Sequence, residues 1–219
     1  AGLAGTQATE AKIAAKADAG LLMEQVPDVT TLKQMAEDAR GVPLGVLLKD
    51  ADATKADELV AAGCDFLVVN TGSAAAVLGN EDAGKFLMLQ PSLDLGMARA
   101  VNSLEVDGVF VSIGTGQPFV AVEHLLACRR FVDLLEKPVM LVLPSMVAKS
   151  DLAGLWQLGI DGIVAAPPQS VKSLAELKKM IEAIPGGPRG RRAKLGARIP
   201  GFAGAVSEEE DDDDYEEDV

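Results

Sequence analysis

Charged side chains directly follow two short apolar runs in the first quarter of the sequence. Lys49 ends the run Pro-Leu-Gly-Val-Leu-Leu-Lys, and Glu24 follows the preceding apolar run. A lysine held at a dry site can form a Schiff base with a carbonyl group or bind an anion. A carboxylate beside it can serve as general acid or base. We therefore predict Lys49 and Glu24 as catalytic residues; the alternative is a partly exposed ion pair without catalytic function.

Uncharged polar side chains follow the next apolar runs. The segments that begin at Asn70 and Ser112 read Asn-Thr-Gly-Ser and Ser-Ile-Gly-Thr-Gly-Gln. Small residues let backbone N–H groups approach a phosphate or carboxylate, although ordinary turns have the same composition. The predicted substrate-binding residues are Asn70, Gln90, Ser112, Thr115 and Ser145.

Other kinds of catalytic site find little support in the sequence. His124 is the only histidine, and it falls inside an amphipathic stretch. One histidine supports neither a metal cluster nor a Ser-His-Asp triad, so we expect no metal and no cofactor. Cys128 follows His124 by four residues, which would allow a Cys-His pair, but a buried helical cysteine is the simpler interpretation. We also interpret Cys64 as structural.

The elements that position these residues form a regular alternation. Seven apolar runs, each followed by an amphipathic segment, span about residues 19–183. Runs that are apolar at nearly every position indicate strands buried on both faces, as in a parallel sheet covered by helices. The predicted strands are Gly20–Met23, Leu44–Leu48, Asp65–Val69, Lys85–Leu89, Asp107–Val111, Val139–Leu143 and Asp161–Ala165.

Two junctions between helix and strand are near copies of each other. Gly63 and Gly159 each end a helix where positive φ is needed, and Asp65 and Asp161 follow two residues later, at the start of a strand. The segments Ala-Ala-Gly-Cys-Asp-Phe-Leu-Val-Val-Asn and Gln-Leu-Gly-Ile-Asp-Gly-Ile-Val-Ala-Ala-Pro resemble those of (β/α)8 TIM barrels. The likeness is to small phosphate-binding barrels such as indole-glycerol-phosphate synthase, thiamine-phosphate synthase and the histidine-biosynthesis isomerases. It implies a site at the carboxyl ends of the strands.

The sequence departs from this family pattern in two ways. The resembled families bind phosphate at glycine-rich turns after their last two strands, whereas here Pro144, Pro167 and Pro168 occupy those loops and supply no N–H donors. Only seven βα units are visible, because residues 1–18 are predicted as a helix. A first strand would then lie upstream, or the barrel would be seven-stranded or open. A doubly wound sheet is the alternative fold, although no Gly-x-Gly-x-x-Gly follows a first strand.

Charge divides the chain into three parts: a barrel domain over 1–185, a basic Gly/Pro/Arg-rich segment over 186–206 and an acidic tail over 207–219. The formal net charge is −13, and the last 13 residues, Ser207–Val219, hold ten of the 33 acids. Without a basic surface the domain is not expected to bind nucleic acid. The tail is expected to keep the protein soluble or to contact a basic surface, including its own segment Arg189–Arg198.

The composition indicates a soluble protein. Apolar residues make up 48% of the chain, and no run approaches the roughly 20 residues of a membrane span. Neither a secretory signal nor a disulfide framework is visible, so we expect a cytoplasmic protein. A mean hydropathy of +0.20 suggests helical surface buried between subunits of a homo-oligomer.

Two functions are compatible with these features. The first is a barrel enzyme of lyase or isomerase type that acts on a small anionic metabolite through Lys49 and Glu24. The second is a barrel without catalysis that acts as a scaffold or assembly subunit through its helical surface and charged tail.

Overall fold

The computed structural model describes residues 1–4, 16–39, 41–49, 52–113, 120–143, 148–168 and 170–184. The chain divides into two units, Ala1–Arg189 and Gly190–Val219, and all described residues belong to the first. The predicted basic segment 186–206 and acidic tail 207–219 therefore lie outside the described residues.

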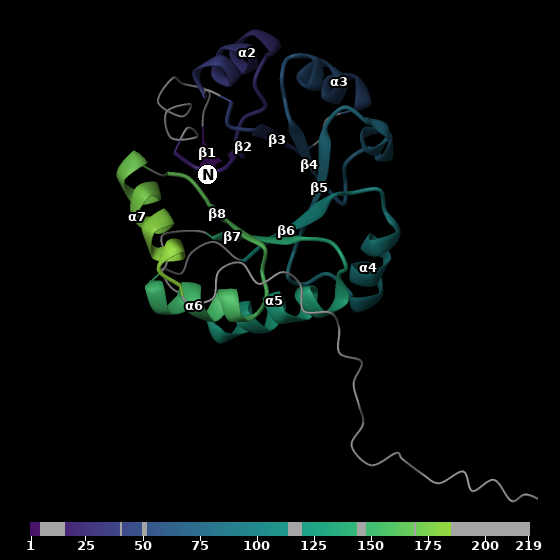
Figure 1. The fold of residues 1–219 in the computed structure, drawn as a ribbon. Coiled ribbons are helices and arrows are strands. Elements are labelled where there is room, and N and C mark those ends of the chain that lie inside the picture. Colours follow the sequence, from purple (N-terminus) through teal and green to yellow (C-terminus); the bar gives the residue numbers. More distant parts are fainter. Residues whose placement is uncertain are drawn as a thin grey trace, which may run out of the picture. The chain divides into compact units, whose positions relative to one another are not determined.

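Eight parallel strands follow one another around the first unit in chain order, and each is hydrogen-bonded to its neighbours in sequence (Figure 1). All seven predicted strands are present, and the TIM-type (β/α) fold is confirmed. A doubly wound sheet is excluded because the strand order never reverses. The strands are β1 (Gly2–Leu3), β2 (Gly20–Leu22), β3 (Leu44–Leu48), β4 (Phe66–Asn70), β5 (Gly84–Leu89), β6 (Gly108–Ser112), β7 (Val139–Leu143) and β8 (Gly162–Ala165).

The strand β1 (Gly2–Leu3) corrects two predictions. A helix was expected over residues 1–18 and a first strand upstream of it, but β1 lies within this stretch and pairs in parallel with β2. Residues 5–15 of the predicted helix lie outside the described residues. Two residues are too short to show a recognisable apolar run. A Cβ placed on Gly2 would lie 2.7 Å from Met23 Sδ and 2.8 Å from the carbonyl oxygen of Ala165. Because Ala165 ends β8, this close approach brings the first and last strands together, and the ring is nearly closed.

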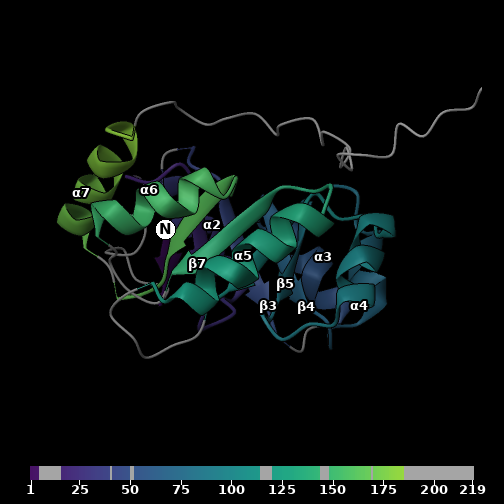
Figure 2. The same cartoon turned by 90° about the horizontal axis from the view of Figure 1, so that it is seen from below.

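Helices surround the ring of strands (Figure 1), and Figure 2 shows α5 and α6 beside β7. Within the described residues, no helix is both long enough and apolar enough to cross a membrane. The helices are α2 (Val29–Asp38), α3 (Ala53–Ala61), η1 (Ala75–Gly79), α4 (Leu95–Ala100), η2 (Val101–Ser103), α5 (Val122–Leu134), α6 (Lys149–Gln157) and α7 (Val171–Glu182).

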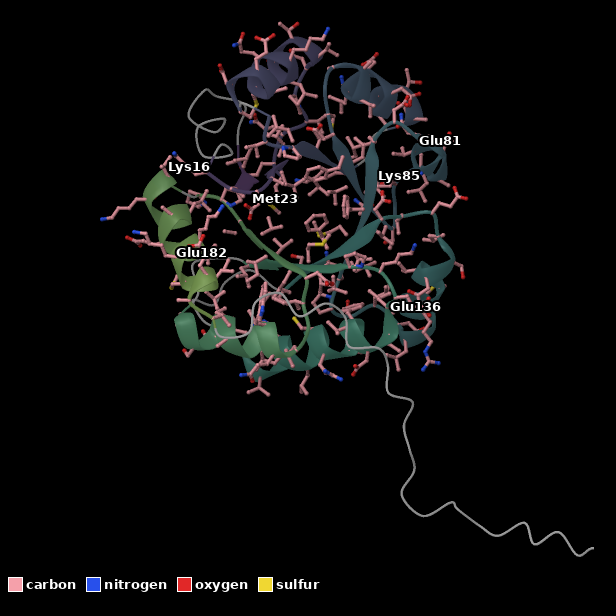
Figure 3. All side chains as sticks on the ribbon, viewed as in Figure 1. Lys16, Met23, Glu81, Lys85, Glu136 and Glu182 are labelled. Atoms are coloured by element: carbon pink, nitrogen blue, oxygen red, sulfur yellow. The ribbon has the colours of Figure 1, made fainter. Side chains whose placement is uncertain are left out.

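Strand alternation separates two apolar cores. The larger core lies between the outer faces of the strands and the helices. The smaller core has buried members from β2, β4, β5, β6, β7 and β8, namely Leu21, Val68, Met88, Phe110, Val142 and Val164. Figure 3 shows side chains filling the ring, so the open centre of the ribbon drawing is a packed interior.

Glycines make room for the large side chains of this interior core. A Cβ on Gly45 would overlap the ring of Phe66, and one on Gly108 would lie 3.1 Å from the ring of Phe86. The space left by the missing side chains lets Phe86 make edge-to-face contacts with Phe66 and Phe110, at ring-centroid distances of 5.5 and 5.4 Å. Phenylalanine rings therefore fill the space that the neighbouring glycines leave in the interior.

Three aspartates fasten the amino ends of the strands. The Asp65 carboxylate accepts the Leu44 N–H at 2.7 Å, and the Asp65 N–H donates to the Leu44 carbonyl oxygen at 2.8 Å. Asp107 makes the same pair of bonds with Lys85, at 2.7 Å each, and Asp161 makes them with Val139, at 2.8 and 2.9 Å. Each aspartate thus holds the first or second residue of the preceding strand through both backbone groups.

Both predicted helix-ending glycines adopt positive φ, 102° at Gly63 and 91° at Gly159. Each glycine turns the chain so that the aspartate two residues later lies just before the next strand and bonds to the preceding one. The repeated Gly-x-Asp junction therefore carries a defined structural function at the amino face of the barrel.

We predict that Asp161→Ala lowers the free energy of unfolding by about 1.5 kcal/mol, because it removes a charged acceptor from the Val139 N–H. Urea unfolding followed by circular dichroism measures the loss. The control is Asp133→Ala, which removes only an exposed i,i+4 ion pair with Arg129 and should cost less than about 0.5 kcal/mol. Equal losses in the two variants would contradict the fastening role of Asp161.

Candidate functional site

The carboxyl ends of β3, β4, β5 and β6 present polar residues at inward-facing positions. Leu47, Val68, Met88 and Phe110 belong to the interior core. Because side chains alternate along a strand, the residue two positions further on faces the same side. These residues are Lys49, Asn70, Gln90 and Ser112.

The strand register groups these four positions into two neighbouring pairs. Leu48 pairs with Val69, so the next residues, Lys49 and Asn70, lie side by side at the ends of β3 and β4. Leu89 pairs with Val111 in the same way, which places Gln90 next to Ser112. Lys49 and Gln90 are exposed, whereas Asn70 and Ser112 are partly buried.

The side chain of Asn70 connects two strand ends. Its Nδ2 donates to the Lys49 carbonyl oxygen at 3.0 Å, and its Oδ1 accepts the Gly72 N–H at 2.8 Å. Ser73 Oγ accepts the Asn70 N–H at 3.1 Å and donates to the Leu48 carbonyl oxygen at 3.3 Å. Asn70 thus fixes the backbone that carries Lys49, and its Nδ2 makes this one hydrogen bond within the described residues.

Ser73 was not among the predicted site residues, yet it completes this turn. An Asn followed by Thr-Gly-Ser after a strand is typical of a turn in which side chains bond to nearby backbone groups. The same four residues are therefore compatible with an ordinary turn and with a ligand-binding loop.

Glu24 lies apart from the pattern of the other candidates. It is exposed and lies in the bend two residues after β2, in which Leu21 belongs to the interior core and Leu22 to the outer core. Because Glu24 lies beyond the strand, alternation along β2 does not place its side chain. Although both residues are within the described part of the chain, no salt bridge joins Glu24 to Lys49.

Two predicted substrate-binding residues, Thr115 and Ser145, lie outside the described residues. Their participation in a site stays a prediction.

An arginine on α5 fastens the loop next to the site. Arg130 Nη2 donates to the carbonyl oxygens of Pro91 and Leu93, the latter at 3.2 Å. The guanidinium carbon also lies 5.1 Å from the centre of the Phe131 ring. Since Pro91 directly follows Gln90, this contact positions the residue at the rim. Nothing in the sequence indicated it, because 39 residues separate Arg130 from Pro91.

The cysteines and the histidine do not form a nucleophilic site. Burial raises the pKa of the Cys64 thiol to about 12 and that of Cys128 to about 11. The Nδ1 atom of His124 accepts the Ala121 N–H at 3.0 Å. In the part of the chain that the structure describes, no group of three or more His, Cys, Asp or Glu side chains could hold a metal ion.

Two hollows lie on the surface of the described residues. One, of about 480 Å³, is lined by residues near the amino end of β4, including Asp57, Asp65 and Asp82. The other, of about 530 Å³, lies between the loop that follows β5 and helix α5, and Arg130 is among its lining residues. Neither hollow is lined by Lys49 or by the other polar residues at the strand ends.

Comparison with known proteins identifies a shared fold. No family model and no curated protein sequence matches this chain. Two structures of mutant tryptophan synthase alpha-subunits from the hyperthermophile Pyrococcus furiosus are similar, with TM-scores of 0.65 and 0.63 and identities of 12% and 11%. The matches cover 84% and 82% of this chain and 95% and 91% of those chains.

A protein from Aquifex aeolicus VF5 is similar with a TM-score of 0.56 and 13% identity, over 81% of this chain and 82% of that one. At these identities the likeness establishes the fold alone. The protein is a (β/α)8 barrel of the TIM type, as the strand order also shows.

We predict that neither thiol reacts with iodoacetamide in the folded protein at pH 7.5. The thiolate is the reactive form, and burial holds the pKa values of Cys64 and Cys128 far above this pH. Mass spectrometry after a short pulse should show no label, and the same pulse in denaturant should label both cysteines. Rapid labelling of Cys128 in the native state would contradict this prediction and support a reactive pair of Cys128 with His124.

Proposed function

We propose that the protein is a barrel enzyme of lyase or isomerase type that acts on a small anionic metabolite at the carboxyl ends of β3 to β6. The observation that carries the proposal is the position of Lys49, a cation at the inward-facing end of β3 with the polar Asn70 beside it. Active sites of TIM barrels lie at this face. The likeness to tryptophan synthase alpha-subunits supports an enzyme on this fold.

The surroundings of Lys49 suit an anion or a polarised carbonyl group. The interior core beneath the rim consists of apolar side chains, so a ligand seated there loses water on one side. Attraction between an ammonium group and an anion strengthens as the local dielectric constant falls. Lys49 would hold the anion or carbonyl oxygen, and Asn70, Gln90 and Ser112 would orient the ligand.

A lyase or isomerase also needs a group that moves a proton. Glu24 is the carboxylate predicted for this role, since it follows the strand next to β3. Glu24 is exposed in the bend after β2, and within the described residues no salt bridge holds it beside Lys49. Lys49 is therefore the stronger candidate of the two, and the first test concerns its charge.

The alternative function is a scaffold or assembly subunit without catalysis. One observation favours it: exposed apolar side chains gather on α4 and α5, where Met97 is 57% and Leu126 is 67% exposed. Such side chains are typical of surfaces that bind another protein. This function and the enzyme use different parts of the barrel, so one does not exclude the other.

We expect Lys49→Ala to weaken the binding of small carboxylates or phosphates at least about tenfold, because a charge-assisted hydrogen bond is lost. A panel of such anions is screened by the rise in melting temperature, and calorimetry then gives the affinity of each anion that stabilises the wild type. Lys33→Ala removes an exposed lysine from α2 and serves as the matched control that keeps full affinity.

Lys49→Arg should retain part of the binding, since the positive charge stays. Unchanged affinity in Lys49→Ala would show that the site is misplaced. Absence of any stabilising anion in the wild type would leave the scaffold as the better proposal.

A further inference from the structure

Large exposed apolar side chains concentrate over two neighbouring helices. Leu95 and Met97 on α4 are 49% and 57% exposed, and Val122 and Leu126 on α5 are 71% and 67% exposed. The two helices pack against each other, and both views show them adjacent (Figures 1 and 2). We call these four residues the α4–α5 face. The other large exposed apolar residues of the described surface are Val26, Leu104 and Val171, each 40–42% exposed.

A hollow lies at the edge of the α4–α5 face. It has a volume of about 530 Å³, and its apolar walls include Pro91, Leu126 and Ala127. Glu123 and Arg130 add one charge of each sign to the lining. The exposed Leu126 and the hollow thus belong to the same patch. Two copies of the patch could therefore fit each other, with the leucine of one copy in the hollow of the other.

The charge of this region differs from that of the chain as a whole. Residues 1–185 hold 15 bases and 23 acids, a net charge of −8, so acidic faces of two copies repel each other. Helices α2 and α3, with their N-cap aspartates, each carry one lysine and three acids. Helices α4 and α5, with the N-cap Asp94, carry three arginines and three acids and are neutral together. Helices α6 and α7 carry four lysines and three acids, so low charge is shared with them, and the exposed apolar side chains are what distinguish the α4–α5 face.

A symmetric dimer requires one patch that complements itself. Exposed charges of both signs lie on the two helices: the Glu123 side chain is 76% exposed, and Arg99 is also exposed. Both signs, apolar protrusions and a hollow together favour a second copy of this chain over a partner of uniform charge.

We propose that the α4–α5 face is the interface of a homodimer in solution, in which Leu126 of each copy enters the hollow beside α5 of the other. Apolar contacts around Val122 and Leu126 stabilise the dimer, and the two helices, which are neutral together, add no net repulsion at the interface. The proposal goes beyond the proposed reaction and does not depend on it.

The test is sedimentation velocity of the full chain at physiological salt, from about 1 to 100 μM. The wild type should be dimeric within this range. Leu126→Glu and Val122→Glu each place a carboxylate in an apolar interface, and each should raise the dissociation constant at least about a hundredfold. Two variants guard against a failure of one to fold, and circular dichroism checks both.

Val171→Glu is the matched control, since Val171 is a 40% exposed apolar residue on α7, away from the α4–α5 face. This variant should remain dimeric. A wild type that is monomeric throughout the range overturns the proposal, as does a dimer that persists in folded Leu126→Glu and Val122→Glu. Dissociation of Val171→Glu alone would assign the interface to a different face.

Discussion

The packing of the barrel interior is the constraint on which the other features depend. Phe66, Phe86 and Phe110 fill the ring because glycines such as Gly45 and Gly108 leave space opposite them. Since side chains alternate strictly along a strand, a shift of one residue would move these rings, and the inward-facing glycines that make room for them, to the outer face. The interior packing therefore fixes the strand register. The register in turn places the polar residues at the ends of β3 to β6 on the inner side.

The two ends of the barrel perform different tasks. At the amino end, Asp65, Asp107 and Asp161 use their carboxylates on backbone N–H groups, so these acids are occupied with holding strands. At the carboxyl end, Lys49 has no ion pair within the described residues, and Asn70 keeps part of its bonding capacity. The distribution agrees with the general placement of stability and chemistry in TIM barrels.

The sequence predicted what short-range patterns can carry. Seven strands were found because buried parallel strands are apolar at nearly every position, and the two helix-ending glycines were found because positive φ favours that residue. The strand Gly2–Leu3 escaped because two residues show no periodicity. The bond from Arg130 to Pro91 escaped because it depends on how α5 packs, which no local pattern encodes.

For the candidate site, the sequence supplied the residue types at the strand ends but not their partners. Alternation places Lys49, Gln90 and Ser112 inward together with Asn70. Glu24 lies beyond the end of β2, so alternation does not place it. The direction of its side chain depends on the turn after β2, which no apolar pattern encodes.

The rim of the barrel and the α4–α5 face meet at one loop. Gln90 ends the inward row of β5, and the next residue, Pro91, lines the hollow beside α5 and receives the bond from Arg130. A molecule seated in the hollow would contact the same loop that sets the position of Gln90. The loop also makes bonds of its own: the Leu93 N–H donates to the Gln90 carbonyl oxygen at 3.0 Å, and the Asp94 carboxylate accepts the Gly96 N–H at 2.8 Å. Arg130 adds bonds from α5 to the carbonyl oxygens of Pro91 and Leu93, so the loop next to Gln90 is held both from within and from the neighbouring helix.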